Sequence, residues 1–196
     1  MGRPAFAHDD PAGRLLARLM ARAAVAGNDA AFAGMIATRC TGGGALPAWL
    51  GLEPAAFHRL LGRHFPGVDV RDLPGIGASH PSADMPARQD EQDEITRLLC
   101  MHRAVEDPSE VWMARILAAG CMGSDHLWQD LGLIERPELT ALMRRNFPGL
   151  AARNVKDMKW KRFLYKQLCE AEGIYTCRAP SCELCTDYDA CFGPDA

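Results

Sequence analysis

Four cysteines near the end of the sequence have the residue type and spacing to hold a metal centre. Cys177, Cys182, Cys185 and Cys191 follow the pattern C-x4-C-x2-C-x5-C. A segment this short cannot bury a core, so four thiols there need disulfides or a metal centre to hold one conformation. The first three reproduce the C-x4-C-x2-C run of plant-type iron–sulfur ligation. The pattern therefore predicts a site for a single iron–sulfur or metal–sulfur cluster in one local loop.

Zinc binding and disulfide formation are the two alternatives to a cluster. Thiolates are soft ligands that select zinc, copper(I) or iron–sulfur clusters. Structural zinc sites usually pair two ligand knuckles across a longer loop, whereas here one C-x2-C is flanked at four and five residues. Disulfides are rare in a reducing compartment, where clustered cysteines are more often metal-binding or catalytic. A cluster accounts for the spacing better than zinc or disulfides do.

The composition of the chain excludes several broad classes of protein. Its 196 residues, apolar fraction of 48% and net charge of −3 suit one globular domain or two very small ones. No run approaches the ~18 apolar residues of a membrane span. The N-terminal segment has no apolar stretch and carries Asp9 and Asp10, unlike a secretion signal. We therefore expect a cytoplasmic protein with no membrane partner, and the mild net charge gives no pull toward nucleic acid.

Helical signals run along the chain before the cysteines. Asp10-Pro11 is typical of a helix start, as N-cap and first helical residue, and Asn28 is a candidate cap for a second helix. A final helix is expected over about 155–172, with Asn154 as its cap and Asp157 in its first turn. Its apolar stripe consists of Trp160, Phe163, Leu164, Leu168 and Ala171. The fold class we predict is all-α, a helical body followed by a cysteine-rich cluster-binding loop.

The two halves of this body share sequence features at a fixed offset. A shift of 81 residues, or 82 for the last pair, superimposes Cys40 on Cys121, Leu50-Gly51-Leu52 on Leu131-Gly132-Leu133, and Phe65-Pro66-Gly67 on Phe147-Pro148-Gly149. Such self-similarity predicts an internal duplication, although shared helix–turn patterns also produce matches by chance. We expect one helical unit over 1–68, an exposed linker over 69–87, a second unit over 88–150, and a basic helix with the cysteine tail over 151–196.

Further side chains near the tail are candidates for the same site. Lys159, Lys161 and Lys166 belong to a basic segment that could stabilise an anionic cluster or attract an oxyanion or an acidic partner; the alternative is a solvated helix face. His126 could bind a metal through nitrogen, or it could simply begin a helix. Cys169 could supply another thiolate, or pack as a small buried hydrophobe.

The C-terminal residues resemble the signature of the NifQ family, the molybdenum-handling proteins of nitrogen fixation. The resemblance covers roughly 90–193. It rests on Met158-Lys159-Trp160-Lys161, on Phe163-Leu164-Tyr165-Lys166-Gln167-Leu168-Cys169-Glu170, on the four tail cysteines with Phe192-Gly193, and on His126-Leu127-Trp128-Gln129-Asp130-Leu131-Gly132-Leu133.

The resemblance implies both a cofactor and a role. The cofactor is an iron–sulfur cluster that incorporates molybdenum, held by Cys177, Cys182, Cys185 and Cys191. The role is to receive molybdenum, from molybdate or another molybdenum source, and to pass it on. The implied recipients are the scaffold and reductase proteins that assemble the iron–molybdenum cofactor of nitrogenase.

Two other functions compete with this one. Cys182-x2-Cys185-x5-Cys191 also resembles the latter part of the WhiB-like iron–sulfur regulator motif, which expects a basic nucleic-acid-binding segment after the cluster. The five residues after Cys191 include Asp195 and no cation, whereas phosphate contacts need Lys or Arg. The third candidate is a helical interaction protein with a structural zinc tail, which predicts one tetrahedral zinc and no sulfide. No nucleophile or acid–base arrangement stands out, so we do not expect an enzyme.

Overall fold

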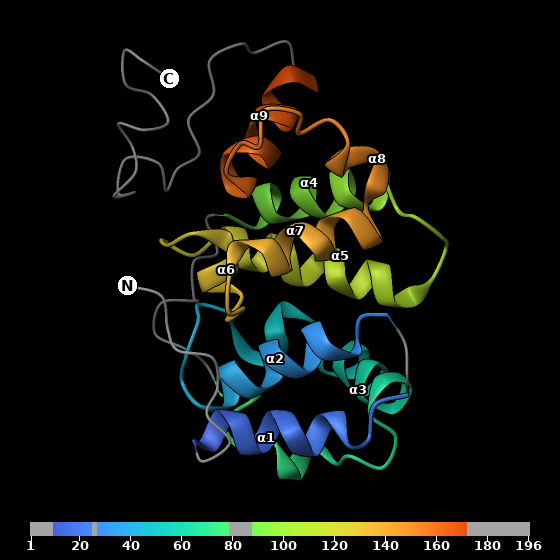
Figure 1. The fold of residues 1–196 in the computed structure, drawn as a ribbon, viewed down its shortest axis with the longest axis vertical. Coiled ribbons are helices and arrows are strands. Elements are labelled where there is room, and N and C mark those ends of the chain that lie inside the picture. Colours follow the sequence, from blue (N-terminus) through green and yellow to red (C-terminus); the bar gives the residue numbers. More distant parts are fainter. Residues whose placement is uncertain (1–9, 25–26, 79–87, 172–196) are drawn as a thin grey trace.

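The computed structural model describes residues 10–24, 27–78 and 88–171. Every regular element within these ranges is an α-helix or a short 3-10 helix, and they contain no strand (Figure 1). This confirms the all-α body predicted from the sequence. In the same ranges, no helix combines the length and the apolar character that crossing a membrane requires.

The first half of the body begins with a capped helix. Helix α1 (Pro11–Met20) starts where the sequence predicts, because Asp10 Oδ1 accepts a hydrogen bond from the Gly13 backbone N–H at 2.6 Å. Proline is well placed at the first helical position, where an N–H would have no helical partner. The following elements are α2 (Asp29–Cys40), η1 (Ala48–Gly51), α3 (Pro54–His64) and η2 (Val70–Asp72).

The second half begins with a similar order of two longer helices, one short helix and another longer helix, and it then continues with two more helices. Helix α5 (Pro108–Cys121) again starts at a proline, and Asp107 Oδ1 caps it by accepting from the Ser109 N–H at 2.8 Å. The elements are α4 (Gln89–Cys100), α5 (Pro108–Cys121), α6 (Leu127–Asp130), α7 (Arg136–Asn146), α8 (Pro148–Ala151) and α9 (Trp160–Ala171).

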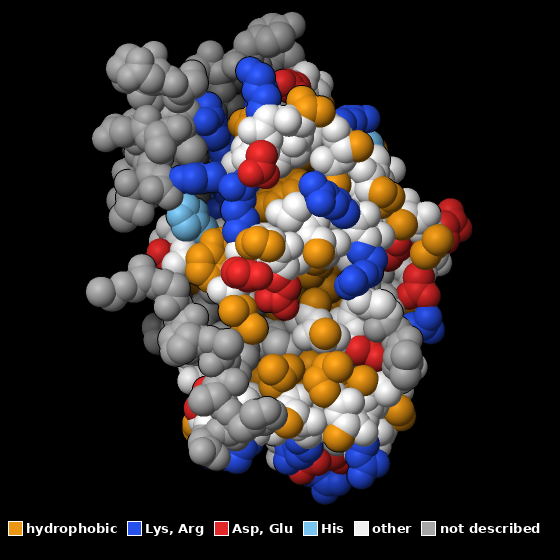
Figure 2. Space-filling view, in the orientation of Figure 1, with side chains coloured by type: hydrophobic (Ala, Val, Ile, Leu, Met, Phe, Trp, Pro, Cys, Tyr) orange, Lys and Arg blue, Asp and Glu red, His pale blue; other side chains and the backbone are white. Residues whose placement is uncertain are grey.

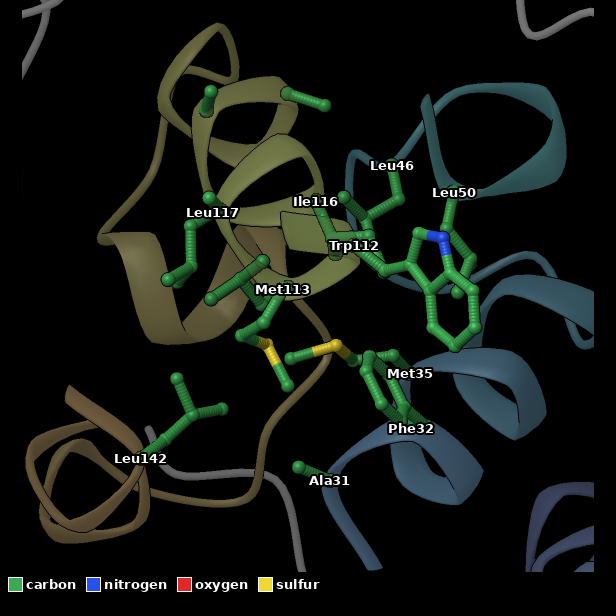
Figure 3. Close-up of a cluster of buried hydrophobic side chains, with 14 of the residues drawn as sticks. Ala31, Phe32, Met35, Leu46, Leu50, Trp112, Met113, Ile116, Leu117 and Leu142 are labelled. Atoms are coloured by element: carbon green, nitrogen blue, oxygen red, sulfur yellow. The ribbon is translucent and has the colours of Figure 1, made fainter. Parts of the chain in front are cut away.

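Two central helices, α2 and α5, form the middle of the molecule. Nearly every residue of both is buried, as expected for helices that are apolar on all sides. Figure 3 shows Phe32 and Met35 of α2 pointing toward Trp112 and Met113 of α5. Around this pair, α1 packs on α2, α4 packs on α5, and α9 packs on α4. The buried hydrophobic side chains of these helices form one continuous core.

Each half contributes a glycine turn that packs on the central helix of the other half. Gly132 has a φ of +74°, and a Cβ built on it would lie 2.4 Å from Thr38 Cγ2 of α2. Gly51 has a φ of +81°, and its Cβ would lie 2.6 Å from Ala119 Cβ of α5. Only glycine combines this backbone conformation with such a close approach. The Thr38 hydroxyl also donates to the Gly132 carbonyl at 2.9 Å.

Buried polar side chains also link the two halves. Each link joins the end of a helix in one half to the start of the central helix in the other. His64 Nε2, at the end of α3, lies 2.8 Å from Ser109 Oγ at the start of α5. Asn146, at the end of α7, exchanges two amide hydrogen bonds with Asn28 before α2, at 2.6 and 3.0 Å. The Asn28 side chain therefore does not cap α2, contrary to our expectation. The four positions correspond under shifts of 81 and 82 residues, while the duplication itself stays a prediction.

The segment predicted as an exposed linker over 69–87 is partly folded into the body. Leu73 and Ile76 are buried in the core. The Ile76 carbonyl accepts from the Trp49 N–H at 2.8 Å, and Arg39 of α2 donates to the Ala78 carbonyl at 2.5 Å. The predicted exposure is wrong for Leu73 and Ile76, because turn signals from proline and glycine do not show where the apolar residues between them point.

The final helix begins later than predicted. Helix α9 starts at Trp160 rather than at 155, and residues 154–158 form a loop instead of a first turn. Asn154 Oδ1 accepts from the Met158 N–H at 2.8 Å, and Asn154 Nδ2 donates to the Met158 carbonyl at 3.0 Å. Asp157 has a φ of +49°, which no residue in a helical first turn adopts. The Asn154 side chain thus stabilises the loop, a local alternative to capping.

Candidate metal centre

The four predicted cluster ligands lie outside the described residues. Cys177, Cys182, Cys185 and Cys191 all belong to residues 172–196, and their role as ligands stays a prediction. Among the residues that the structure does describe, no group of three or more His, Cys, Asp or Glu side chains is placed to hold a metal ion. The described part of the site is the support that leads into the tail.

This support is helix α9, whose apolar face is held by the body. The helix ends at Ala171, six residues before Cys177. Trp160 and Phe163 are buried, with ring centroids 5.7 Å apart and an interplanar angle of 87°, the edge-to-face geometry that aromatic pairs favour. Trp160 Nε1 donates to Thr140 Oγ1 of α7 at 3.1 Å. The indole thus satisfies its polar atom while its rings exclude water.

Lys161 anchors the start of α9 through a buried ammonium group. Its Nζ donates to the Gly123 carbonyl at 2.9 Å and to the Asp125 carbonyl at 2.6 Å, and it forms an ion pair with the Asp130 carboxylate of α6. These three acceptors match the three donors of an ammonium. Burial raises the pKa of Asp130, and the charge of Lys161 opposes that rise. The arrangement ties α9 to the turn that precedes α6.

A second polar anchor holds the middle of α9. Arg88, just before α4, donates to the Tyr165 hydroxyl oxygen at 2.9 Å. The same guanidinium donates to both carboxylate oxygens of Glu91, at 2.9 and 2.6 Å, and to the Met122 carbonyl at 3.1 Å. Because Arg88 is fixed by the bidentate pair, it holds Tyr165 at a defined place.

The three lysines that were predicted to attract a partner differ in their exposure to solvent. Lys161 is buried and neutralised by Asp130, so it does not belong to an exposed basic surface. Lys159 is half-buried, and Lys166 is exposed with Glu170 one turn later at 3.5 Å. Figure 2 shows Lys and Arg side chains gathered over α7, α8 and α9. The exposed cations of these elements and their connections are Arg144, Arg145, Arg153, Lys156 and Lys166.

The two predicted accessory ligands lie on different elements. His126 is the residue before α6, half-buried, and its backbone N–H donates to Gln129 Oε1 at 3.3 Å. This is the helix-start position that was the alternative to metal binding. Cys169 is half-buried in the last turn of α9. Lys161 brings the two elements together, because it binds the carbonyl of Asp125, the neighbour of His126.

Three cysteines of the body are free thiols whose surroundings favour the protonated form. Burial raises the pKa of the Cys40 thiol to about 11 and that of the Cys121 thiol to about 12, and it also raises the pKa of Cys100. The thiolate is the form that binds metals. These three positions therefore disfavour ligation and favour packing.

A Ser–His–Asp arrangement lies in the core, and the sequence did not reveal it. His64 Nδ1 is 2.5 Å from Asp29 Oδ1, and His64 Nε2 is 2.8 Å from Ser109 Oγ. This is the connectivity of a nucleophile triad, but all three residues are buried, and the rings of Phe32 and Trp112 lie 4.7 and 6.1 Å from the imidazole. A substrate needs space beside the hydroxyl, and core side chains fill it. We therefore interpret these residues as a structural link between α2, α3 and α5.

The chain matches a known protein family over most of its length. The family model described as NifQ matches residues 31–193, a span from α2 to beyond the last tail cysteine. The chain belongs to the NifQ family. It is 46% identical over 156 residues to Protein NifQ of Azotobacter vinelandii, which covers 76% of this chain and 80% of that protein. It is 38% identical over 157 residues to Protein NifQ of Rhodobacter capsulatus, covering 80% and 83%.

Another NifQ relative extends this similarity. The Protein NifQ homolog of Sinorhizobium fredii is 38% identical over 145 residues, which covers 73% of this chain and 60% of that protein. No solved structure matches the chain. The resemblance to NifQ drawn from the C-terminal residues is thus confirmed, and membership of the family implies a role in nitrogen fixation.

Proposed function

We propose that this NifQ-family chain carries an iron–sulfur cluster containing molybdenum on its cysteine tail and supplies that molybdenum for the iron–molybdenum cofactor of nitrogenase. The observation that carries the proposal is the family match over 31–193, which includes the complete C-x4-C-x2-C-x5-C pattern. Thiolates are the ligands expected for such a cluster. The recipients are the scaffold and reductase proteins of cofactor assembly, in the cytoplasm. The chain acts as a donor rather than as an enzyme.

The described residues that precede the tail support this proposal. Helix α9 is fixed by two polar anchors, Lys161 with Asp130 and Tyr165 with Arg88. Between 136 and 166 the chain has nine Lys or Arg and two Asp or Glu. A cluster bound by four thiolates is usually anionic, and nearby cations lower the energy of such a charge. The excess of positive charge in the segment that precedes the tail therefore suits an anionic, thiolate-bound cluster.

Metal and sulfide analysis tests the proposal. We expect iron, acid-labile sulfide and molybdenum in the chain after anaerobic purification, and loss of all three in Cys182→Ala. Cys40→Ala is the matched control, because that thiol lies in the body and burial raises its pKa to about 11; it should retain all three. Zinc without sulfide in the wild type would end the proposal in favour of a structural zinc tail. Iron and sulfide without molybdenum would instead favour a redox-sensing role.

The lysines of α9 give a second test of the same proposal. We expect Lys159→Glu and Lys166→Glu together to lower molybdenum loading or transfer, because they replace two positive charges of the segment that precedes the tail by negative ones. The measurement is molybdenum per chain and its transfer to the assembly scaffold. Arg59→Glu, an exposed charge reversal on α3, is the control. Unchanged loading and transfer in the double variant would remove these lysines from the site.

A further inference from the structure

Val155 is a large apolar side chain that is exposed on the surface. Its relative exposure of 86% is the largest among the exposed large hydrophobic side chains of the described residues. It lies in the 154–158 loop, between α8 and α9. Single exposed apolar side chains are common on protein surfaces, so exposure alone indicates nothing. The loop that carries Val155 and the charges around it are the deciding observations.

The 154–158 loop is held in one conformation by several hydrogen bonds. Asn154 binds Met158 through both its side-chain oxygen and nitrogen, at 2.8 and 3.0 Å. Arg136 of α7 donates to the Asp157 carboxylate at 2.8 Å and to the Asp157 carbonyl at 2.6 Å. Asp157 has a φ of +49°, a conformation that costs energy for a residue other than glycine and persists only where its surroundings impose it. The loop therefore presents Val155 with little ordering entropy left to lose on binding.

Two cations flank Val155 in a chain that is acidic as a whole. Arg153 and Lys156 flank it, and both are exposed. The segment 136–166 has nine Lys or Arg against two Asp or Glu, although the whole chain has a net charge of −3. Figure 2 shows Lys and Arg side chains on the surface over α7, α8 and α9. An apolar side chain between charged ones matches, on a small scale, the apolar core and polar rim of a protein–protein interface.

We propose that Arg153, Val155 and Lys156 form a docking surface for an acidic protein. We name these three residues the Val155 surface. Val155 enters an apolar pocket of the partner, and the two cations pair with carboxylates around that pocket. The inference rests on the proposed function, in which a recipient of molybdenum must approach the chain, and it places the docking charges before α9 rather than on it. The buried Lys161 takes no part.

Binding to the purified cofactor-scaffold protein tests the Val155 surface. The variants are Val155→Glu and Lys156→Glu. The controls are Val105→Glu, another exposed valine at 63%, and Arg59→Glu, another exposed cation. We expect about tenfold weaker binding in each test variant, and binding within about twofold of wild type in the controls, by biolayer interferometry. Affinity of the wild type should fall as sodium chloride rises, because the rim is electrostatic. All variants should keep the wild-type melting temperature.

Several results would overturn the proposal. These are wild-type affinity in both test variants, equal weakening in the controls, or no binding of the scaffold by the wild type. Retention of the wild type by anionic lipid vesicles through Val155, without protein binding, would also overturn it. Molybdenum content of the same samples separates the two proposals. A chain without molybdenum that still binds the scaffold through Val155 would contradict the donor function and leave the docking surface standing.

Discussion

Lys161 and Asp130 place two opposite charges where their side chains are only 9% and 2% exposed. Removing charges from water is costly, and their attraction offsets that cost only when the remaining donors and acceptors are also satisfied. The carbonyls of Gly123 and Asp125 supply that satisfaction for Lys161. A buried pair of this kind adds little net stability, but its donors and acceptors are satisfied only when the two side chains lie in this one arrangement. It therefore specifies where α9 lies on the body.

Removing one member of this pair should be much more harmful than removing both. We expect Lys161→Met to lower the free energy of unfolding by about 3–5 kcal/mol, because it leaves the Asp130 carboxylate buried and unpaired. Lys161→Met with Asp130→Leu should cost clearly less than the sum of the single changes. Urea denaturation followed by circular dichroism measures all four chains of the cycle. Additive effects would show that the two charges are not coupled.

The body thiols should react slowly at neutral pH. Burial raises the pKa of Cys40 to about 11, so at pH 8 its thiolate is about a hundredfold scarcer than that of an ordinary cysteine. We expect alkylation of Cys40 by iodoacetamide to be slow at pH 8 and to accelerate as the pH rises toward 11. Peptide mass spectrometry of the native chain at several pH values measures this rate. Fast labelling at pH 7 would contradict it.

At the scale of elements, substitutions at two glycines distinguish the energetic cost of backbone strain from that of overpacking. Gly42 and Gly132 have similar φ values of +77° and +74°, but only Gly132 has atoms within contact distance, with Thr38 Cγ2 at 2.4 Å from a built Cβ. Gly42→Ala should cost about 1–2 kcal/mol, the strain of a left-handed residue. Gly132→Ala should cost at least about 1 kcal/mol more, since it also overpacks the α2 contact. Thermal and urea unfolding of both variants measure this; equal losses would contradict the packing argument.

Helix starts were predictable where the signal is local. Asp10-Pro11 begins α1 because cap and proline act on the same turn. Asn28 and Asn154 carry the same kind of signal, but the first binds Asn146, which is 118 residues away, and the second binds Met158 within a loop. A capping side chain read from sequence is assumed to bind its own helix, and a tertiary or loop contact can take it instead.

The candidate site also has one part that could be predicted from the sequence and one part that could not. Its cysteine ligands were predicted from spacing, and the NifQ family from the residues around them. Its support was not predictable, because Lys161 meets Asp130 across 31 residues and Tyr165 meets Arg88 across 77. A basic run in the sequence cannot show which of its charges turns inward. The sequence pattern therefore places Lys161 with the exposed lysines, although its ammonium is buried.

At the scale of the whole molecule, the crossed contacts make the halves depend on each other. Gly51 and Gly132 pack on the opposite central helices, and His64 joins α3 to Ser109 of α5 and to Asp29 of α2. Among the described residues, buried hydrophobic side chains from both halves belong to one cluster. The proposed sequence division at 69–87 therefore does not mark two hydrophobic cores.

A shared core predicts one cooperative unfolding transition. We expect amides in the middle of α2 and α5 to exchange hydrogen only through global unfolding, with equal free energies of opening. His64→Ala leaves Asp29 and Ser109 buried without their partner, so it should lower both values together by about 1–3 kcal/mol. Exchange measured by mass spectrometry on wild type and variant tests this, beside coincident urea transitions by fluorescence and circular dichroism. If α2 lost protection while α5 kept it, the halves would be separate folding units and the crossed contacts only a boundary between them.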